Sequence, residues 1–125
     1  MADWNREFGK KGEDLAAKRL SKLGYKIIER NYRTPAGEID IIATDGEYLV
    51  FVEVKSRSDL SFGAPELAVN RHKRRQMEKA ALLYLMKKGG ADKPCRFDVV
   101  CINAAPDADA ECEVIKDAFE LSGGY

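Results

Sequence analysis

Two acidic residues and a lysine lie on neighbouring runs of alternating apolar and polar residues in this 125-residue chain. Asp40 belongs to the run 38–44, and Glu53 and Lys55 belong to the run 47–56. Magnesium prefers hard oxygen ligands, commonly one or two carboxylates together with waters and phosphate oxygens. A cation held in this way activates water and neutralises charge on a phosphodiester, while a nearby lysine orients the attacking water. The combination indicates metal-assisted phosphodiester hydrolysis.

The two runs must form a hairpin if these side chains are to meet. Asp45-Gly46 separates them and is a strong signal for a two-residue turn. A turn there pairs Asp40 with Phe51 and leaves Asp40 diagonal to Glu53, at roughly 7 to 8 Å. The acids and the lysine then share one face, which a helix is expected to cover in part; the alternative is a solvated strand face with one internal salt bridge. The opposite face is expected to be plain core and carries Ile39, Ile41, Tyr48, Val50, Val52 and Val54.

The remaining chain supplies helices and strands around this hairpin. Apolar periodicity predicts helices over residues 4–23 and 66–88, each followed by glycine. Strand-forming residues predict further strands over 25–32, 96–103 and 112–119. The order is helix, three strands, helix, two strands, so we expect one α/β domain over residues 1–125, with a mixed five-stranded sheet flanked by helices.

The balanced charge of 21 basic and 21 acidic residues hides a strong asymmetry along the chain. Residues 1–93 hold 19 basic and 14 acidic residues, whereas residues 94–125 hold 2 and 7. Basic residues are densest at the start of the second predicted helix, where they could face nucleic-acid phosphates or form an ordinary solvated helix face. The candidate nucleic-acid-binding residues are Arg57, Arg71, Lys73, Arg74, Arg75 and Lys79.

Cysteine and histidine usage bears on metal type and location. Three cysteines without a CxxC pair, and a single histidine, argue against zinc and against a disulfide framework. The chain has no run of 18 apolar residues, and charged residues interrupt its first eleven positions, where a signal peptide needs an apolar stretch. We therefore expect a cytoplasmic protein with reduced thiols and no membrane span.

Asp40 followed by Glu53-Val54-Lys55 resembles the PD-(D/E)xK nuclease superfamily, which includes restriction endonucleases and Holliday-junction resolvases. More closely, nearly the whole chain resembles the YraN-like family of small bacterial proteins. The motifs that carry this resemblance are Gly-Glu at 12–13, Gly-Glu-Ile-Asp at 37–40, Phe-Val-Glu-Val-Lys-Ser-Arg at 51–57, Phe-Gly at 62–63, Lys73 and Arg-Phe-Asp-Val-Val at 96–100. In place of the superfamily's proline before the aspartate stands Ile39.

The resemblance implies a restriction-endonuclease-like core and assigns roles within it. Asp40 and Glu53 would bind Mg²⁺ or Mn²⁺, and Lys55 would be the catalytic lysine. Glu13 occupies the place of the first-helix acid that completes the metal site in resolvase-like members; the alternative is a solvent-facing helix glutamate.

Three other polar residues have two readings each. Glu38 is either an acid supporting the metal ligands or a surface residue where the strand begins. Arg57 either meets a phosphate or pairs with Glu53 at the rim. Lys73 falls on the apolar stripe of its helix, so it either reaches the site or extends past the stripe to solvent.

The expected function is therefore a Mg²⁺- or Mn²⁺-dependent DNA endonuclease. Its resolvase-like resemblance implies action on branched or structured DNA, and a homodimer is expected because two strands must be cut. One alternative is a catalytically silent nucleic-acid-binding protein with the same fold. Another is an interaction scaffold that uses its acidic C-terminal segment.

Overall fold

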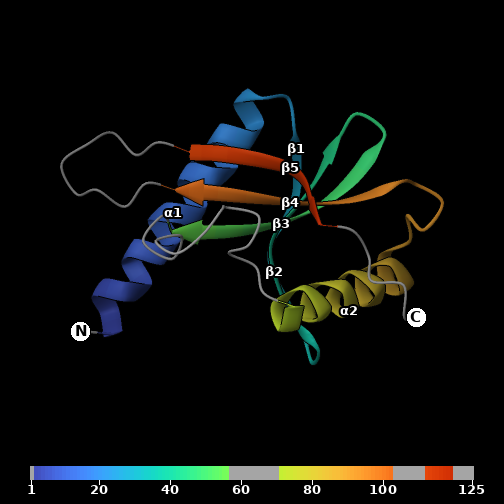
Figure 1. Cartoon of the computed structure of the whole chain (residues 1–125), viewed down its shortest axis with the longest axis horizontal. Coiled ribbons are helices and arrows are strands. Elements are labelled where there is room, and N and C mark those ends of the chain that lie inside the picture. Colours follow the sequence, from blue (N-terminus) through green and yellow to red (C-terminus); the bar gives the residue numbers. More distant parts are fainter. Residues whose placement is uncertain (1, 57–70, 103–111, 120–125) are drawn as a thin grey trace.

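The computed structural model describes residues 2–56, 71–102 and 112–119, with side chains described from residue 11 onward except that of residue 56 (Figure 1). These residues form two helices and five strands in the order expected from the sequence. The second predicted helix begins at residue 66, but residues 66–70 lie outside the described part, as does Arg57. The elements are α1 (Ala2–Lys22), β1 (Lys26–Thr34), β2 (Gly37–Asp45), β3 (Tyr48–Ser56), α2 (Arg71–Lys88), β4 (Cys95–Ile102) and β5 (Cys112–Phe119).

The five strands form one mixed sheet in sequential order, β1-β2-β3-β4-β5. Strands β1, β2 and β3 are antiparallel neighbours, β3 and β4 are parallel, and β5 returns antiparallel to β4. A parallel pair needs a long crossover connection, and α2 lies within the one that joins β3 to β4. The predicted mixed α/β architecture is confirmed.

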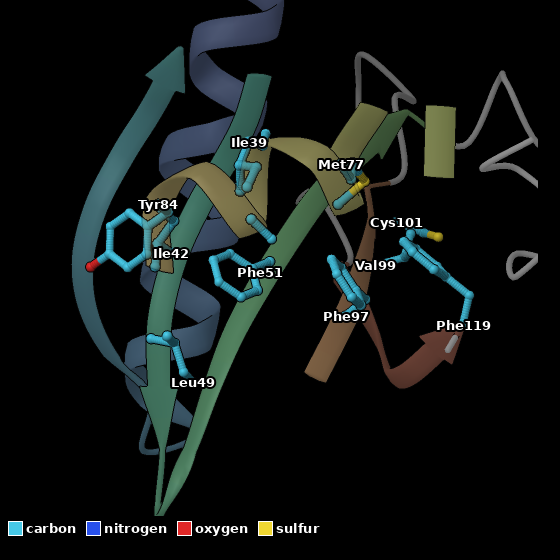
Figure 2. Close-up of a cluster of buried hydrophobic side chains, with 12 residues drawn as sticks. Ile39, Ile42, Leu49, Phe51, Met77, Tyr84, Phe97, Val99, Cys101 and Phe119 are labelled. Atoms are coloured by element: carbon cyan, nitrogen blue, oxygen red, sulfur yellow. The ribbon is translucent and has the colours of Figure 1, made fainter. Parts of the chain in front are cut away.

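Successive residues of a strand point to opposite sides of the sheet, so both faces carry apolar side chains that must be covered. Each of the two helices covers one face. On one face, Met77 and Tyr84 of α2 pack against Phe51 and Phe97 (Figure 2). On the other face, Ala16 and Leu20 of α1 pack in a second cluster that includes Val50, Val52, Val100 and Ile102. The central hairpin is thus buried on both faces, which makes any polar residue on it costly unless it is paired.

The turn of the central hairpin lies one residue later than the sequence predicted. Asp45 pairs with Tyr48, so the two turn residues are Gly46 and Glu47, and Gly46 adopts a φ of 60°. A contact from a distant strand accounts for the difference: the Asp45 carboxylate accepts a 2.8 Å hydrogen bond from Arg96 of β4, which holds Asp45 in the strand. The shift moves each partner by two residues, so the faces of the strands are preserved.

Strand β2 also departs from the simple alternation that the sequence predicted. Ile39 packs on the α2 face with Phe51, whereas Ile41 packs on the α1 face, and Tyr48 is exposed rather than buried. The pairing of β2 with β3 extends only to Ile41 and Val52. On the other side of β2, Asn31 lies between the β1 residues paired with Ile41 and Ile39, in a left-handed conformation with φ 54°. The alternation of faces along β2 is broken here, at Asp40.

Helix α2 approaches the start of β2 closely. A Cβ atom added at Gly37 would lie 3.0 Å from Gln76 Cβ and 3.1 Å from the Gln76 carbonyl oxygen. Such distances are too short for a side chain, so glycine is required there for packing. Because Lys73 lies one turn before Gln76, the same contact places Lys73 near the start of β2.

No helix in the described ranges has both the length and the apolar composition needed to cross a bilayer. Cys95, Cys101 and Cys112 lie on β4 and β5 as thiols rather than disulfides.

Candidate active site

The Asp40 carboxylate lies where the β2–β3 ladder, which ends at Ile41 and Val52, would otherwise continue. Asp40 Oδ2 accepts a 2.8 Å hydrogen bond from the backbone N–H of Val54. The side chain thereby satisfies a donor on β3 that β2 no longer reaches. This bond fixes the Asp40 carboxylate against the strand that carries Glu53 and Lys55. The predicted juxtaposition of Asp40 with Glu53 is therefore present, by a contact that differs from the diagonal pairing expected.

Glu53 is the most deeply buried of these residues, with 4% of its surface exposed. Its Oε1 atom lies 3.7 Å from Lys55 Nζ and 3.8 Å from Lys73 Nζ, distances of ion pairs rather than of short hydrogen bonds. Its Oε2 atom is buried and has no hydrogen-bond partner among the described residues. This burial does not fit the alternative of a solvated strand face.

The pKa values of the two carboxylates show how unfavourable their environment is for negative charge. Burial, followed by repulsion from Asp40, raises the pKa of Glu53 to about 8. Burial also raises the pKa of Asp40, although its hydrogen bond from Val54 acts in the opposite direction. A pair of buried acids with raised pKa values is typical of functional sites, although structural ion pairs can produce the same shifts.

Glu13 brings a third carboxylate from α1. Burial, and then repulsion from Asp40, raises the pKa of Glu13, while Arg30 of β1 at 3.9 Å lowers it. The Oε1 atom of Glu13 is buried without a hydrogen-bond partner in the described part of the chain. Arg30 also donates a 2.7 Å hydrogen bond to Asp14 Oδ1, which joins α1 to β1 and holds Glu13 toward the site. The Glu13 side chain as a whole is 20% exposed, so it lies between the two alternatives of a site ligand and a solvent-facing glutamate.

These carboxylates suit a divalent cation by their chemistry. Hard oxygen atoms are the ligands that Mg²⁺ and Mn²⁺ prefer, and Glu13 and Glu53 each offer a buried oxygen without a hydrogen bond. Within the described ranges, no group of three or more His, Cys, Asp or Glu side chains stands close enough to form a complete metal cage. Magnesium usually binds only one or two carboxylates and retains waters, so an incomplete cage fits it.

The other predicted site residues lie at different places. Glu38 is partly exposed and pairs with Arg33 at 3.8 Å, at the edge of the site. Lys73 reaches Glu53, as one of its two readings predicted. Arg74 lies 5.2 Å from the centre of the Phe119 ring. Arg71, Arg75 and Lys79 are exposed on α2, and Arg57 lies outside the described residues.

A second polar cluster was missed in the sequence. Asp98, fully buried on β4, accepts hydrogen bonds from the Tyr25 hydroxyl at 2.7 Å and from Arg96 Nε and Nη2 at 2.9 Å each. The backbone N–H of Asp117 adds a further bond at 2.9 Å. Tyr25, just after α1, is therefore buried and also donates a hydrogen bond across the fold. The sequence did carry a signal for this cluster, since an aspartate stands inside the apolar run 97–102 and a buried charge needs partners.

The described elements define a mixed α/β protein, and its five-stranded sheet and two helices are consistent with a restriction-endonuclease-like core. Residues 12–102 match the family described as Uncharacterised protein family UPF0102, a stretch that contains Glu13, Asp40, Glu53 and Lys55. The chain belongs to this family. The match confirms the expected membership of a family of uncharacterised bacterial proteins.

Full-length relatives show the same relationship. A UPF0102 protein of Geobacter sulfurreducens is 51% identical over 119 residues, covering 94% of this chain and 92% of the relative. One from Syntrophus aciditrophicus is 48% identical over 120 residues, covering 96% and 94%. One from Symbiobacterium thermophilum is 47% identical over 115 residues, covering 92% and 98%. These proteins are similar in length as well as in sequence.

Proposed function

We propose that this protein is a Mg²⁺- or Mn²⁺-dependent DNA endonuclease that hydrolyses phosphodiester bonds, with branched or otherwise structured DNA as its substrate. The observation that carries the proposal is the buried Glu53 carboxylate. When ionised, it has an oxygen that receives no hydrogen bond from the described residues, and it stands beside a lysine and a second carboxylate, with which it can share a hydrogen bond only if one of the two acids is protonated. A buried carboxylate is costly unless it is paired, and a bound cation would provide the missing partner.

Each residue has a distinct task in this proposal. Asp40 and Glu53 would hold the cation, and Glu13 on α1 would bind one of the waters that Mg²⁺ retains, because no three acidic side chains of the described residues are close enough to bind one ion directly. The cation, when bound, neutralises charge on the phosphodiester and makes water more acidic. Lys55 donates a hydrogen bond that orients the attacking water. Lys73 pairs with Glu53 and so limits the motion of that carboxylate between the sheet and α2.

Substrate binding is assigned to the exposed basic residues of α2. Arg71, Arg75 and Lys79 are solvent-exposed near the helix end that carries Lys73. Arginine and lysine on one helix face bind phosphates and supply affinity that does not depend on base sequence. We include a homodimer in the proposal, since cutting both strands requires two sites. A cytoplasmic location accords with the thiol state of the cysteines.

The test compares cutting of four-way-junction, flap, linear duplex and single-stranded DNA with Mg²⁺, with Mn²⁺ and with EDTA. We expect cutting only with a metal ion, and no cutting by Glu53→Gln protein. This substitution preserves the shape of the side chain and removes a repelling charge, so the variant should remain folded. Glu47→Gln changes an exposed glutamate in the hairpin turn and serves as the matched control, with full activity.

The same assay separates the alternative functions. DNA binding that weakens with salt, without metal-dependent cutting, would support the catalytically silent binding protein. Negligible DNA affinity even at low salt would support the interaction scaffold instead. Cutting that persists unchanged in Glu53→Gln protein would point to a contaminating nuclease and remove the enzyme proposal.

A further inference from the structure

A cavity of about 350 Å³ lies beside α2 and has no role in the proposed chemistry. Its lining combines apolar and basic side chains from the β1–β2 turn and the last turns of α2. The lining includes Tyr32, Arg33, Pro35, Leu83, Met86 and Lys87. Protein pockets that bind small molecules have volumes of roughly 300 to 1,000 Å³. The cavity is therefore large enough for a flat aromatic group such as a nucleobase.

The apolar wall of this cavity is unusually open to solvent. Met86 is 82% exposed and Leu83 is 37% exposed, although both lie on a helix that packs its other face against the sheet. Tyr32 lies below them with its ring edge-to-face against Tyr84, at a centroid distance of 5.2 Å. That contact holds the Tyr32 ring in one orientation. An immobilised aromatic ring beside apolar side chains is a suitable surface for stacking a base.

The charges around the cavity favour an anionic ligand. Arg33, with 80% of its side chain exposed, comes from β1, and Lys87 comes from the last turn of α2. None of the described residues that line the cavity is acidic. Glu38, which pairs with Arg33 at 3.8 Å, lies on the side toward the candidate active site. An apolar recess between two cations complements a base flanked by phosphates.

Helix geometry connects this cavity with the basic residues already assigned to phosphate binding. Arg75, Lys79 and Met86 are spaced by four and seven residues, so they follow one exposed line along α2. This line runs from the N-terminal end of α2, where Lys73 contacts Glu53, to the cavity at the other end of the helix. Phosphates bound along Arg75 and Lys79 would bring the next nucleotides of the same strand to Met86.

We propose that the cavity between the β1–β2 turn and the end of α2 binds an unpaired nucleotide of single-stranded DNA. The base stacks against Tyr32 and Met86, and Arg33 and Lys87 bind the flanking phosphates. This inference rests on the proposed nuclease function and narrows its substrate to DNA that carries an unpaired segment next to the cutting site.

The test measures binding rather than cutting, with fluorescently labelled oligonucleotides in EDTA. The probes are a thymine 12-mer, an abasic 12-mer with the same phosphates but no bases, and a 12-base-pair duplex. We expect the thymine strand to bind roughly tenfold more tightly than the abasic strand, because stacking of a base on an aromatic side chain contributes within this range. Met86→Asp should abolish the difference between the two strands and leave duplex binding nearly unchanged.

Two further variants control the interpretation. Leu23→Asp replaces an exposed apolar residue that does not line the cavity, and it should bind all three probes like the wild-type protein. Lys87→Gln should weaken binding of the thymine and abasic strands by the same factor, because it removes a phosphate contact only. Met86 is so exposed that its substitution should leave the fold intact.

The outcomes distinguish this inference from the function on which it rests. Equal affinity of the wild-type protein for the thymine and abasic strands would overturn the inference, as would a Met86→Asp protein that retains the preference. If Met86→Asp lost affinity for all three probes, Met86 would contact DNA in general and not a base, and this result would also overturn the inference. A preserved preference for bases, together with no metal-dependent cutting, would leave the pocket standing and reject the nuclease.

Discussion

A glutamate buried beside an aspartate loses hydration and meets a like charge, so its ionised form is costly. Glu53 shows both effects, since its pKa is raised to about 8 by burial and then by Asp40. Lys55 and Lys73 offset the charge only in part, at 3.7 and 3.8 Å. We expect the carboxylate to be protonated over much of the physiological range until a cation binds.

This raised pKa predicts how the metal-free protein responds to pH. A folded-state pKa of about 8 exceeds the ordinary value of 4.5, so the folded protein binds the proton more tightly than the unfolded chain does. The associated stability is complete below pH 4.5 and is lost as the pH rises toward 8. Urea unfolding in EDTA from pH 4.5 to 9 should show this fall.

Glu53→Gln is the control for the pH dependence. It removes the titrating group, so its free energy of unfolding should change less with pH than that of the wild-type protein. Some dependence should persist, because burial also raises the pKa values of Asp40 and Glu13. Identical slopes for the two proteins would contradict the assignment of the raised pKa to Glu53.

Binding of a metal ion should offset the loss of stability that the ionised Glu53 carboxylate causes at high pH. At pH 8, saturating Mn²⁺ should raise the thermal midpoint of the wild-type protein, since a ligand that binds only the folded state stabilises it. The same concentration should have little effect on Glu53→Gln. Calorimetric titration with Mn²⁺ would check the affinity directly, and equal binding by both proteins would place the metal elsewhere.

Lys55 provides a test of chemistry that is separate from metal binding. Removing a residue that moves or orients protons typically slows a reaction by about 10²- to 10⁴-fold. Lys55→Ala should therefore lose cutting by that order while it retains Mn²⁺ binding, as measured by calorimetry. Retained cutting in Lys55→Ala would remove this lysine from the mechanism.

At the scale of the elements, the site depends on how closely α2 docks on β2. Gly37 permits this contact because a Cβ atom there would meet Gln76 at 3.0 to 3.1 Å. Moving α2 outward would also displace Lys73, one turn away, from Glu53. The absence of a side chain at Gly37 thus helps to determine where the Lys73 ammonium group lies in the site.

Gly37→Ala should consequently affect both stability and activity. Overpacking of this kind typically costs about 1 to 3 kcal/mol, and we expect a loss of cutting at temperatures where the protein remains folded. The control is Gly46→Ala, at a turn with φ 60° and open space around it. It should destabilise the protein by roughly 1 kcal/mol without a specific loss of cutting. A Gly37→Ala protein with normal kinetics would show that α2 tolerates the shift.

At the scale of the whole molecule, the cluster around Asp98 joins segments that are far apart in sequence. Tyr25 follows α1, Arg96 and Asp98 lie on β4, and Asp45 ends β2. The Arg96 guanidinium makes a bidentate pair with Asp98 and lies 5.1 Å from the centre of the Tyr48 ring. These contacts hold the turn end of the central hairpin against β4.

Removing one member of this cluster should destabilise the entire fold. Asp98→Ala leaves Arg96, whose side chain is 11% exposed, without its main partner, and breaking a buried pair costs roughly 3 to 5 kcal/mol. Tyr25→Phe removes only a hydroxyl and should cost about 1 kcal/mol. Denaturant unfolding checks both values, and cutting by Tyr25→Phe should be normal because the cluster is not part of the active site.

Much of this architecture was readable from the amino-acid pattern alone. The order of helices and strands, the mixed sheet and the central hairpin follow from periodicity and from the Asp45-Gly46 signal, because local residues determine them. The grouping of Glu53 with Lys55 on one strand face follows from the two-residue period of a strand. The turn was misplaced by one residue because Arg96, 51 positions away, holds Asp45 in the strand.

Local pattern determined which side chains could share a face, but it did not determine how deeply they are buried or what they contact. The Asp40 bond to Val54, the approach of Glu13 from α1 and the contact of Lys73 with Glu53 depend on where the β2–β3 pairing ends and on the docking of two helices. These contacts join residues that are distant along the chain. Their geometry, and the raised pKa values that follow from it, arise only when the separate elements pack together.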